Sequence, residues 1–374
     1  MIFRFSSKSS PDYFFLEILL VLIIFGLVML TSASSDIGRL RFGDSYYYIK
    51  HQLLYGLLLG IIGFLIGLFI DFRFLEKLAP LFLILSIISL ILVFTPLGFK
   101  SGGSERWLSL GPLSFQPGEL LKLTFLIYLS SWLSRNLKRS KSFIQGFLPF
   151  LFLAAVVSLL LFLQPATTTA IIILAASLIM YFTAGAKIKF LVALVLITLL
   201  GVAVLITVTP YRFQRITSWL TSFKGQNADI LGKGYHLNQA LIAIGSGRIF
   251  GVGYGQSTTK INYLPGSIDD SIFAVIAEEL GFVGSAGLVF LFLLFIWRGI
   301  NIAAAAPDNF SRYLVTSFIS LIGLQAFINI GAISGLIPLT GIPLPFISYG
   351  GTALAVFLTM SGIILNISRW RLKK

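Results

Sequence analysis

The sequence predicts an all-α polytopic membrane protein with ten transmembrane helices. The mean hydropathy of the 374 residues is +0.94, and only 11% of them are charged. Soluble domains carry about a quarter charged residues, so this chain cannot maintain an ordinary water-facing surface. Apolar stretches of about 20 residues, the length that crosses a bilayer as a helix, recur along the whole chain.

Ten apolar stretches are the candidate spans. They lie at residues 13–33, 53–70, 78–97, 120–134, 146–163, 168–184, 190–208, 271–297, 313–334 and 348–367. The first is too long in its apolar core for a cleavable signal peptide, and no A-x-A site follows it. Because the number of spans is even, both termini are expected on the same side of the membrane.

The charge balance indicates which side that is. Lys and Arg number 28 against 14 acidic residues, which gives a net charge of +14. Membrane proteins collect basic residues in cytoplasmic loops. The excess of basic residues is therefore explained better by the cytoplasmic loops of a membrane protein than by nucleic-acid binding. The dense basic runs at 136–141 and 369–374 predict cytoplasmic termini in a multi-pass protein of the cytoplasmic membrane. The sequence has no Cys and two His, which excludes disulfides, thiolate metal sites and His-rich metal centres.

Two segments on the opposite, extracytoplasmic side are long enough to hold a site. One is 98–112, and the other is a large loop at 209–270 between the seventh and eighth spans. Long loops of this kind are usually functional or disordered. Within the second loop, 237–245 predicts a short amphipathic helix, and the glycine-rich run 245–255 predicts tight turns rather than a phosphate-binding P-loop. Any chemistry is therefore expected at the outer face.

Glu119, Glu278 and Glu279 lie in or at the edge of apolar spans, where an ionised group costs about 3 kcal/mol. Glu119 has Lys122 three residues later on the same helix face, so the two form either a structural charge pair or the polar floor of an outer-facing cavity. Glu278 and Glu279 point about 100° apart on a helix, and we expect one of them to face the bundle interior.

Asp269 and Asp270 follow a Pro-Gly turn and precede an apolar span. One of them is expected to cap the new helix, which leaves the other for a hydroxyl group or a metal ion. The basic residues of the surrounding loop could bind phosphates or simply contact lipid headgroups. They are Arg212, Arg215, Arg248 and Lys260.

Four motifs in order, at 103–122, 243–260, 264–284 and 325–352, resemble the SEDS family of peptidoglycan polymerases, which includes FtsW, RodA and SpoVE. The last reads Q-A-F-I-N-I-G-A-I-S-G-L-I-P-L-T-G-I-P-L-P-F-I-S-Y-G-G-T. The resemblance covers nearly the whole chain and implies one SEDS-type membrane domain over 1–374. It also implies a glycosyltransferase that polymerises lipid II at the outer face of the cytoplasmic membrane, together with a class B penicillin-binding protein.

The resemblance assigns site residues as well. Asp270 falls on the essential aspartate of the family's L-P-x-x-x-x-D motif and is the expected catalytic base. The implied substrate-binding residues are Arg106, Trp107, Gln116, Glu119, Lys122, Arg212, Arg215, Gln239, Ser246, Lys260, Asn329, Ser348 and Tyr349. A divalent cation, Mg²⁺ or Mn²⁺, is a candidate for offsetting the charge of the departing pyrophosphate, as are Arg106, Arg212, Arg215 and Lys260.

The chain departs from the family pattern at several positions. Gly266, Ile268 and Asp269 stand where Glu, His and Thr are usual, and Gly118 stands for Ser. Ala166 replaces the acid of the usual Q-P-D-x-G-T motif, so part of the family's site is compensated or lost.

The sequence is also compatible with alternative functions. The runs at 337–352 and 45–52 lean toward an FtsW-like role in septal synthesis, with a RodA-like elongation role or a sporulation role as alternatives. A flippase for the lipid-linked precursor would need polar groups through the full membrane depth, whereas here they gather at the outer edge. A non-catalytic scaffold for division proteins would not depend on Asp270.

Overall fold

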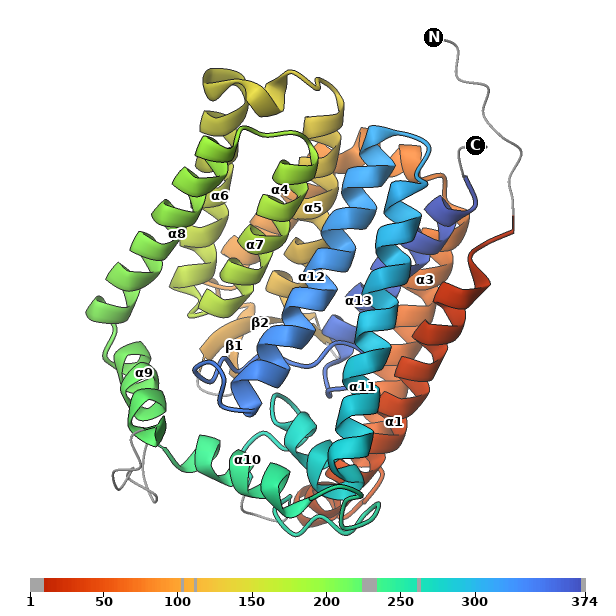
Figure 1. The fold of residues 1–374 in the computed structure, drawn as a ribbon, viewed down its shortest axis with the longest axis vertical. Helices are drawn as coiled ribbons and strands as arrows, with labels where there is room; N and C mark the ends of the chain where they lie inside the picture. Colours follow the sequence, from red (N-terminus) through yellow and green to blue (C-terminus); the bar gives the residue numbers. More distant parts are fainter. Residues whose placement is uncertain (1–9, 102–103, 111–112, 224–233, 261–263, 371–374) are drawn as a thin grey trace.

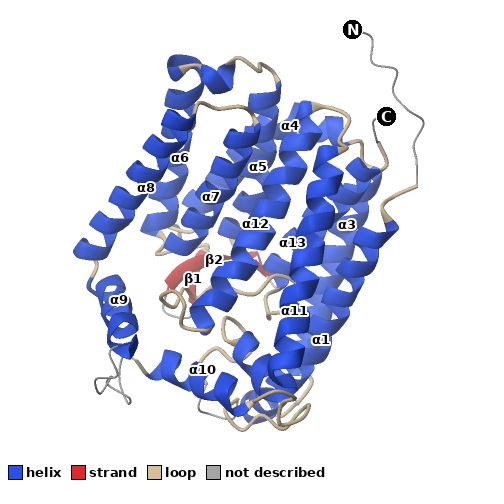
Figure 2. Cartoon of the chain, viewed as in Figure 1, coloured by secondary structure: helices blue, strands red, loops and turns tan. Residues whose placement is uncertain are grey.

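The computed structural model describes residues 10–101, 104–110, 113–223, 234–260 and 264–370, which form a helical bundle with one small sheet (Figures 1 and 2). The α-helices are α1 (Tyr13–Phe42), α2 (Tyr47–His51), α3 (Leu59–Phe69), α4 (Phe72–Leu92), α5 (Pro117–Ser134), α6 (Leu148–Leu163), α7 (Thr167–Thr183), α8 (Ile188–Val208), α9 (Pro210–Phe223), α10 (Tyr235–Ser246), α11 (Ile272–Ala304), α12 (Asn309–Ile333) and α13 (Gly351–Ser368). Shorter helical turns are η1 (Gln52–Leu58), η2 (Arg139–Lys141) and η3 (Phe143–Phe147).

Each predicted apolar stretch overlaps a helix, which confirms the all-α membrane class. Within the described residues, eight helical segments are long and apolar enough to cross a membrane. They are Tyr13–Phe42, Tyr47–Phe69, Phe72–Leu92, Phe143–Leu163, Ile188–Val208, Ile272–Ala304, Asn309–Ile333 and Gly351–Ser368. Of the remaining two, α7 is apolar but shorter, and α5 carries Glu119 and Lys122. The count of ten crossings stays a prediction.

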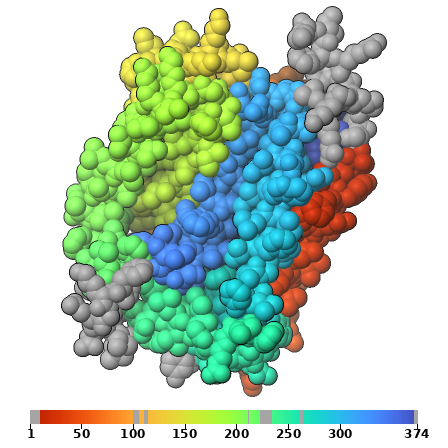
Figure 3. Space-filling model, in the orientation of Figure 1, coloured from red at the N-terminus to blue at the C-terminus, as the bar shows by residue number. Residues whose placement is uncertain are grey.

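Burial separates central helices from peripheral ones. In the apolar part of α13, 72% of the residues are buried, and in α12 61%. In α8 only 6% are buried, so this helix turns almost all of its surface outward. The space-filling view shows α8 and α9, in green, along the edge of the molecule, with the surface hollowed between them and the blue α12 (Figure 3). The α12–α13 pair and the segment between them therefore form the scaffold on which a site can be held rigidly.

Local signals explain where several helices begin and end. Asp12 accepts a hydrogen bond from the backbone of Phe15 at the start of α1, and Gly43 ends that helix in the left-handed conformation. Asp308 and Ser311 form a reciprocal capping box at the start of α12. Gly281 interrupts α11 with φ 68° and ψ −163°, values that only glycine adopts readily. The resulting kink lies near the end of α11 that faces the long loop.

The start of the first helix and the end of the last helix lie together at one end of the bundle. The backbone N–H of Asp12 donates to Ser368 Oγ at 3.0 Å, and Arg298 pairs with Asp12 at 2.7 Å. The start of α1 and the end of α13 thus lie at one end, as an even number of spans requires, and α9, α10 and the sheet lie toward the other (Figure 1).

The predicted outer segment 98–112 contains the sheet. Strands β1 (Gly98–Ser101), β2 (Ser104–Leu110) and β3 (Leu113–Phe115) pair antiparallel in that order, with Phe99 opposite Trp107. In the longer loop, α10 confirms the short helix predicted at 237–245. Residues 224–233 and 261–263 of that loop lie outside the described part of the chain.

Candidate functional site

Asp269 and Asp270 lie in a tight turn just before α11. The backbone N–H groups of Asp269 and Ser271 both donate to the carbonyl of Gly266 at 2.9 Å. The expectation that an aspartate caps the helix is wrong: Ser271 is the N-cap residue, and no side chain caps the helix there. The turn that ends in the bond from Ser271 to Gly266 places the N-cap position at Ser271, one residue after Asp270. Neither carboxylate accepts a hydrogen bond from the first N–H groups of α11. Both carboxylates therefore remain available to other partners.

The absence of a side chain at Gly266 makes room for Asp270. Gly266 has φ 63°, and a Cβ added to it would lie 2.1 Å from Asp270 Oδ1. A side chain there could not coexist with this position of the carboxylate. The departure from the family pattern at Gly266 thus matches the turn that this chain forms.

The segment between α12 and α13 holds the aspartate turn from its other side. Asn329 Nδ2 donates to the backbone carbonyls of Asp270 at 2.8 Å and Ile342 at 2.7 Å. Ser348 Oγ donates to the carbonyl of Asp269 at 2.5 Å, and the N–H of Tyr349 donates to Ile268 at 2.9 Å. The structure therefore brings the predicted residues Asn329, Ser348 and Tyr349 to Asp270, where they position its backbone.

A guanidinium faces the second oxygen of Asp270. A Cβ added to Gly341 would lie 3.8 Å from Asp270 Oδ2 and 3.9 Å from both terminal nitrogens of Arg215. Arg215 is held from α9 by a hydrogen bond to the carbonyl of Leu339 at 3.1 Å. A carboxylate oxygen and a cationic group thus both border the position that a side chain of residue 341 would occupy.

The environment raises the pKa of both carboxyls. Displacement of water by the surrounding protein raises the pKa of Asp269 to about 7, the charge of Asp270 adds to this rise, and Arg41 opposes it. The same desolvation raises the pKa of Asp270, whereas His236 and Arg215 oppose the rise. Asp269 still has solvent access, and Asp270 is half-buried. A carboxylate with a raised pKa is a stronger base, which suits proton abstraction.

A second cluster supports the same segment from within the bundle. Lys122 Nζ donates to Glu119 at 2.6 Å and to Gln325 Oε1 at 2.8 Å, and Gln325 donates to the carbonyl of Pro343 at 2.9 Å. Lys122 is fully buried. This geometry confirms the predicted charge pair, which supports the segment through Gln325.

A third cluster fixes the glycine-rich run onto α11. The expectation that only one of Glu278 and Glu279 faces inward is wrong, because both are buried. Glu278 accepts bonds from the hydroxyls of Ser257 and Thr259 and from the N–H of Thr258. Glu279 pairs with Lys260 at 2.9 Å. The two carboxylates point to different partners, and the loop that folds over α11 supplies enough donors for both.

The remaining predicted residues lie apart from Asp270. Arg106 on β2 donates to the carbonyls of Gln164 and Pro165, beside the buried Ala166 where the family's acid is missing. Trp107 packs against Phe99 with ring centroids 6.4 Å apart, and the N–H of Gln116 donates to Thr352.

Three predicted residues make only local contacts or none. Arg212 bonds Thr209, which directly precedes its helix, and Ser246 bonds the carbonyl of Ala243. Gln239 is half-buried on α10. Lys260, already paired with Glu279, has no exposed charge to offer a phosphate. Their roles as substrate contacts stay predictions.

Sequence reasoning missed four residues at this site. Arg41 and Gly341 come from segments far from the aspartates in the sequence, and no local signal marked them. Ser271 and His236 could have been noticed, because Ser271 follows the aspartates directly and His236 is one of only two His in the chain. Among the described residues, no group of three or more His, Asp or Glu could hold a metal ion.

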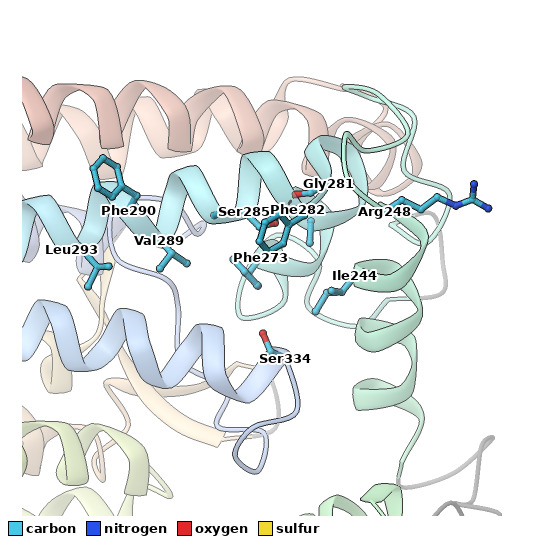
Figure 4. Close-up of a pocket in the computed structure, with 12 residues that line it drawn as sticks. Ile244, Arg248, Phe273, Gly281, Phe282, Ser285, Val289, Phe290, Leu293 and Ser334 are labelled. Carbon is cyan, nitrogen blue, oxygen red and sulfur yellow. Dashed lines mark hydrogen bonds between the residues drawn. The ribbon is translucent and has the colours of Figure 1, made fainter.

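A recess of about 500 Å³ opens on the side of α11, beside the kink (Figure 4). Its lining is mainly apolar and includes Phe273, Val289, Phe290 and Leu293. Arg248 and Ser334 are polar residues of the lining, and in the close-up the Arg248 side chain points away from the recess (Figure 4). The recess is thus suited to an apolar occupant.

Comparisons with known proteins show similarity along nearly the whole chain. A family model described as "Cell cycle protein", FTSW_RODA_SPOVE, matches residues 13–373. The chain is 39% identical over 366 residues to stage V sporulation protein E of Bacillus subtilis (strain 168), covering 98% of this chain and 99% of that protein. It is 40% identical over 365 residues to a probable peptidoglycan glycosyltransferase FtsW of Nitrosococcus halophilus (strain Nc4), covering 96% of this chain and 93% of that protein.

Two solved structures share the fold. One, titled "Structural coordination of polymerization and crosslinking by a peptidoglycan synthase complex", matches with a TM-score of 0.78 and 28% identity over 96% of this chain and 98% of that chain. The rod shape determining protein RodA of Thermus thermophilus matches with a TM-score of 0.69 and 29% identity over 97% of this chain and 98% of that chain.

Proposed function

The chain belongs to the FtsW/RodA/SpoVE family of cell cycle proteins, and from this premise we propose that it polymerises lipid II into glycan strands at the outer face of the cytoplasmic membrane. It is a peptidoglycan glycosyltransferase, as relatives along nearly its full length are named. The observation that carries the proposal is that Asp270 Oδ2 and the Arg215 guanidinium come close to the same point at Gly341, where an added Cβ would lie 3.8 Å from the carboxylate oxygen and 3.9 Å from the guanidinium nitrogens.

The reaction follows from these two groups. Asp270 Oδ2 takes the proton of the 4-hydroxyl of one lipid-linked disaccharide as that oxygen attacks the anomeric carbon of another. The bond from the anomeric carbon to the pyrophosphate oxygen breaks, and the lipid pyrophosphate leaves with the bonding electrons. A positioned general base contributes about 10²- to 10⁴-fold. One base opposite the leaving group inverts the anomeric centre without a covalent sugar intermediate.

Arg215 stabilises the negative charge that builds on the departing pyrophosphate. The mechanism uses no metal-bound step, because Asp269 and Asp270 offer only two carboxylates and face Arg41 and Arg215. A candidate Mg²⁺ or Mn²⁺ would instead arrive with the pyrophosphate of the substrate. Polymerisation assays with and without EDTA test that part.

We propose that the end of the bundle that holds Asp270 lies at the outer face of the cytoplasmic membrane. At the opposite end, short connections between helices carry basic residues: Arg73 follows the start of α4, Arg139 lies in η2 and Lys187 precedes α8. Cytoplasmic loops collect Lys and Arg. This distribution supports cytoplasmic termini and an extracytoplasmic Asp270. Labelling of single Cys residues introduced at each end, by a reagent that does not cross the membrane, tests the orientation.

The direct test uses the purified chain and labelled lipid II, with and without a class B penicillin-binding protein. Asp270→Asn should abolish polymer while the protein remains monodisperse in detergent. A flippase or a scaffold would retain its function in this variant. If the variant polymerises lipid II at the rate of the unmodified chain, Asp270 is not the base.

A role in septal synthesis is the more specific proposal, since FtsW names dominate among the full-length relatives. An elongation role is the alternative, supported by the shared fold with RodA. Depletion of the protein should block septation and produce filaments. Round cells that still divide would favour the elongation role.

We also propose that the partner is a class B penicillin-binding protein whose membrane helix packs into the recess on α11. The matched solved structure is titled as a synthase complex for polymerisation and crosslinking. Gly281, Ser285 and Ala286 line the recess, and small residues let membrane helices approach closely. Ala286→Trp should reduce co-purification of the partner, whereas Leu196→Trp on the outward-facing α8 should not. Equal co-purification by both variants would place the partner elsewhere.

A further inference from the structure

A hydrogen-bonded chain runs from α10 to Asp270. His236 Nε2 lies 2.6 Å from Ser271 Oγ, and Ser271 Oγ lies 3.5 Å from Asp270 Oδ1. Ser271 is fully buried, and His236 lies on the second residue of α10, partly buried against the start of α11. The second contact is long, as catalytic hydrogen bonds often are without substrate.

The number of hydrogens on these three side chains determines which of them donates in each hydrogen bond. A serine hydroxyl has one hydrogen, and a carboxylate can only accept. If Ser271 donates to Asp270, its oxygen must accept the N–H of His236, which requires the proton on Nε2. Burial lowers the pKa of His236, and Arg215 lowers it further, whereas Asp270 opposes the shift. Asn329, the polar α12 residue at this turn, is uncharged. A neutral imidazole protonated at Nε2 satisfies all of these contacts.

The two oxygens of Asp270 are thereby separated in role. Oδ1 lies beside Ser271 and so close to Gly266 that an added Cβ there would be 2.1 Å away. Oδ2 faces the space at Gly341. An aspartate held at only one oxygen has a defined orientation for the other, which a base needs in order to meet its proton at the right angle.

Given the glycosyltransferase activity proposed above, we propose that His236 is a positioning residue which, through Ser271, holds Asp270 Oδ1 so that Oδ2 stays directed at the acceptor hydroxyl. It does not touch substrate. The usual His of the family motif is replaced here by the buried Ile268, so the imidazole at this turn comes from α10 instead. Its effect on the rate should therefore run entirely through Ser271.

The experiment measures lipid II polymerisation by the full-length chain with its penicillin-binding partner across pH. The variants are His236→Ala, Ser271→Ala and the double variant, with Asn238→Ala on the same helix as the matched control. His236→Ala and Ser271→Ala should each lower kcat about tenfold with KM nearly unchanged. Both should also move the acid limb of kcat to higher pH, because Asp270 loses a hydrogen bond that stabilises its ionised form.

The double variant distinguishes positioning from packing. If His236 acts through Ser271, the double variant is no worse than Ser271→Ala alone. Additive losses, or a His236→Ala acid limb identical to that of the unmodified chain and of Asn238→Ala, would overturn the inference. His236→Gln, whose amide N–H can still donate to Ser271, should recover most of kcat. If His236→Ala does not fold, the comparison uses His236→Gln and Ser271→Ala. An acid limb of kcat that moves in Ser271→Ala but not in His236→Gln supports the inference. An equal shift of the acid limb in both variants overturns it.

Failure of the proposed function gives a different result. In that case the unmodified chain, supplied with its partner and lipid II, makes no polymer at any pH. If the unmodified chain and His236→Ala make polymer at the same rate, only the proposed role of His236 is wrong.

Discussion

Lys122 and Glu119 form an ion pair of 2.6 Å whose side chains are almost completely buried between α5 and α12. Desolvating two charges is costly, and the pair repays that cost only while both partners are present. Within the described residues, Glu119 Oε2 has no hydrogen-bond partner, so its charge depends on Lys122. The pair therefore ties the helices together and, through Gln325, supports the segment that holds Asp270.

Replacing Lys122 by Met should lower the free energy of unfolding by about 3–5 kcal/mol, because it leaves the Glu119 carboxylate buried and uncompensated. Thermal unfolding in detergent measures the change. Combining Lys122→Met with Glu119→Gln should recover part of the loss, since the second change removes the stranded charge. A double variant that is less stable than Lys122→Met alone would contradict this account.

Local patterns predicted much of this molecule. Apolar stretches located the helices, and the spacing of Glu119 and Lys122 predicted their contact because an α-helix brings residues three apart onto one face. The amphipathic pattern at 237–245 predicted α10 in the same way. These features depend only on residues close in the sequence.

Features that depend on distant segments were not predictable. Glu278 is buried because the loop at 257–259 folds over it and supplies donors. Arg215 comes close to Asp270 beside Gly341, although Gly341 lies more than a hundred residues after Arg215 in the sequence. None of these contacts leaves a local signal in the sequence.

Asp269→Thr should stabilise the protein at pH 8 and have little effect near pH 4. The folded-state pKa of Asp269 is raised to about 7 from a reference of 3.8. Between these values the folded carboxyl keeps a proton that the unfolded chain has lost, so stability falls as pH rises through that window. Because Asp269 has solvent access, screening reduces the size of the effect. Melting temperatures of both proteins at the two pH values check the sign, and a variant that melts lower at pH 8 would refute it.

Arg215→Gln should move the acid limb of kcat to higher pH and lower kcat at every pH. The charge of Arg215 holds down the pKa of Asp270. Without it, a larger share of Asp270 is protonated at a given pH and cannot act as a base. The lost positive charge also slows departure of the pyrophosphate. Arg212→Gln is the comparison, since the described hydrogen bond of Arg212 goes to Thr209, the residue that directly precedes α9. A larger pH shift in Arg212→Gln would transfer the role to that residue.

Gly266→Ala should abolish most of the activity, a larger loss than its effect on stability alone would cause. A Cβ at this position would lie 2.1 Å from Asp270 Oδ1, so the carboxylate must rotate away from Ser271 and lose the orientation of Oδ2. The backbone strain of an alanine at φ 63° adds about 1–2 kcal/mol on its own. Gly255→Ala separates the two effects, because Gly255 has φ 79° and no atom within 4 Å of an added Cβ. Polymerisation rates and melting temperatures should show both variants equally destabilised but only Gly266→Ala inactive. Equal activities would mean that the orientation of Asp270 in this turn does not set the rate.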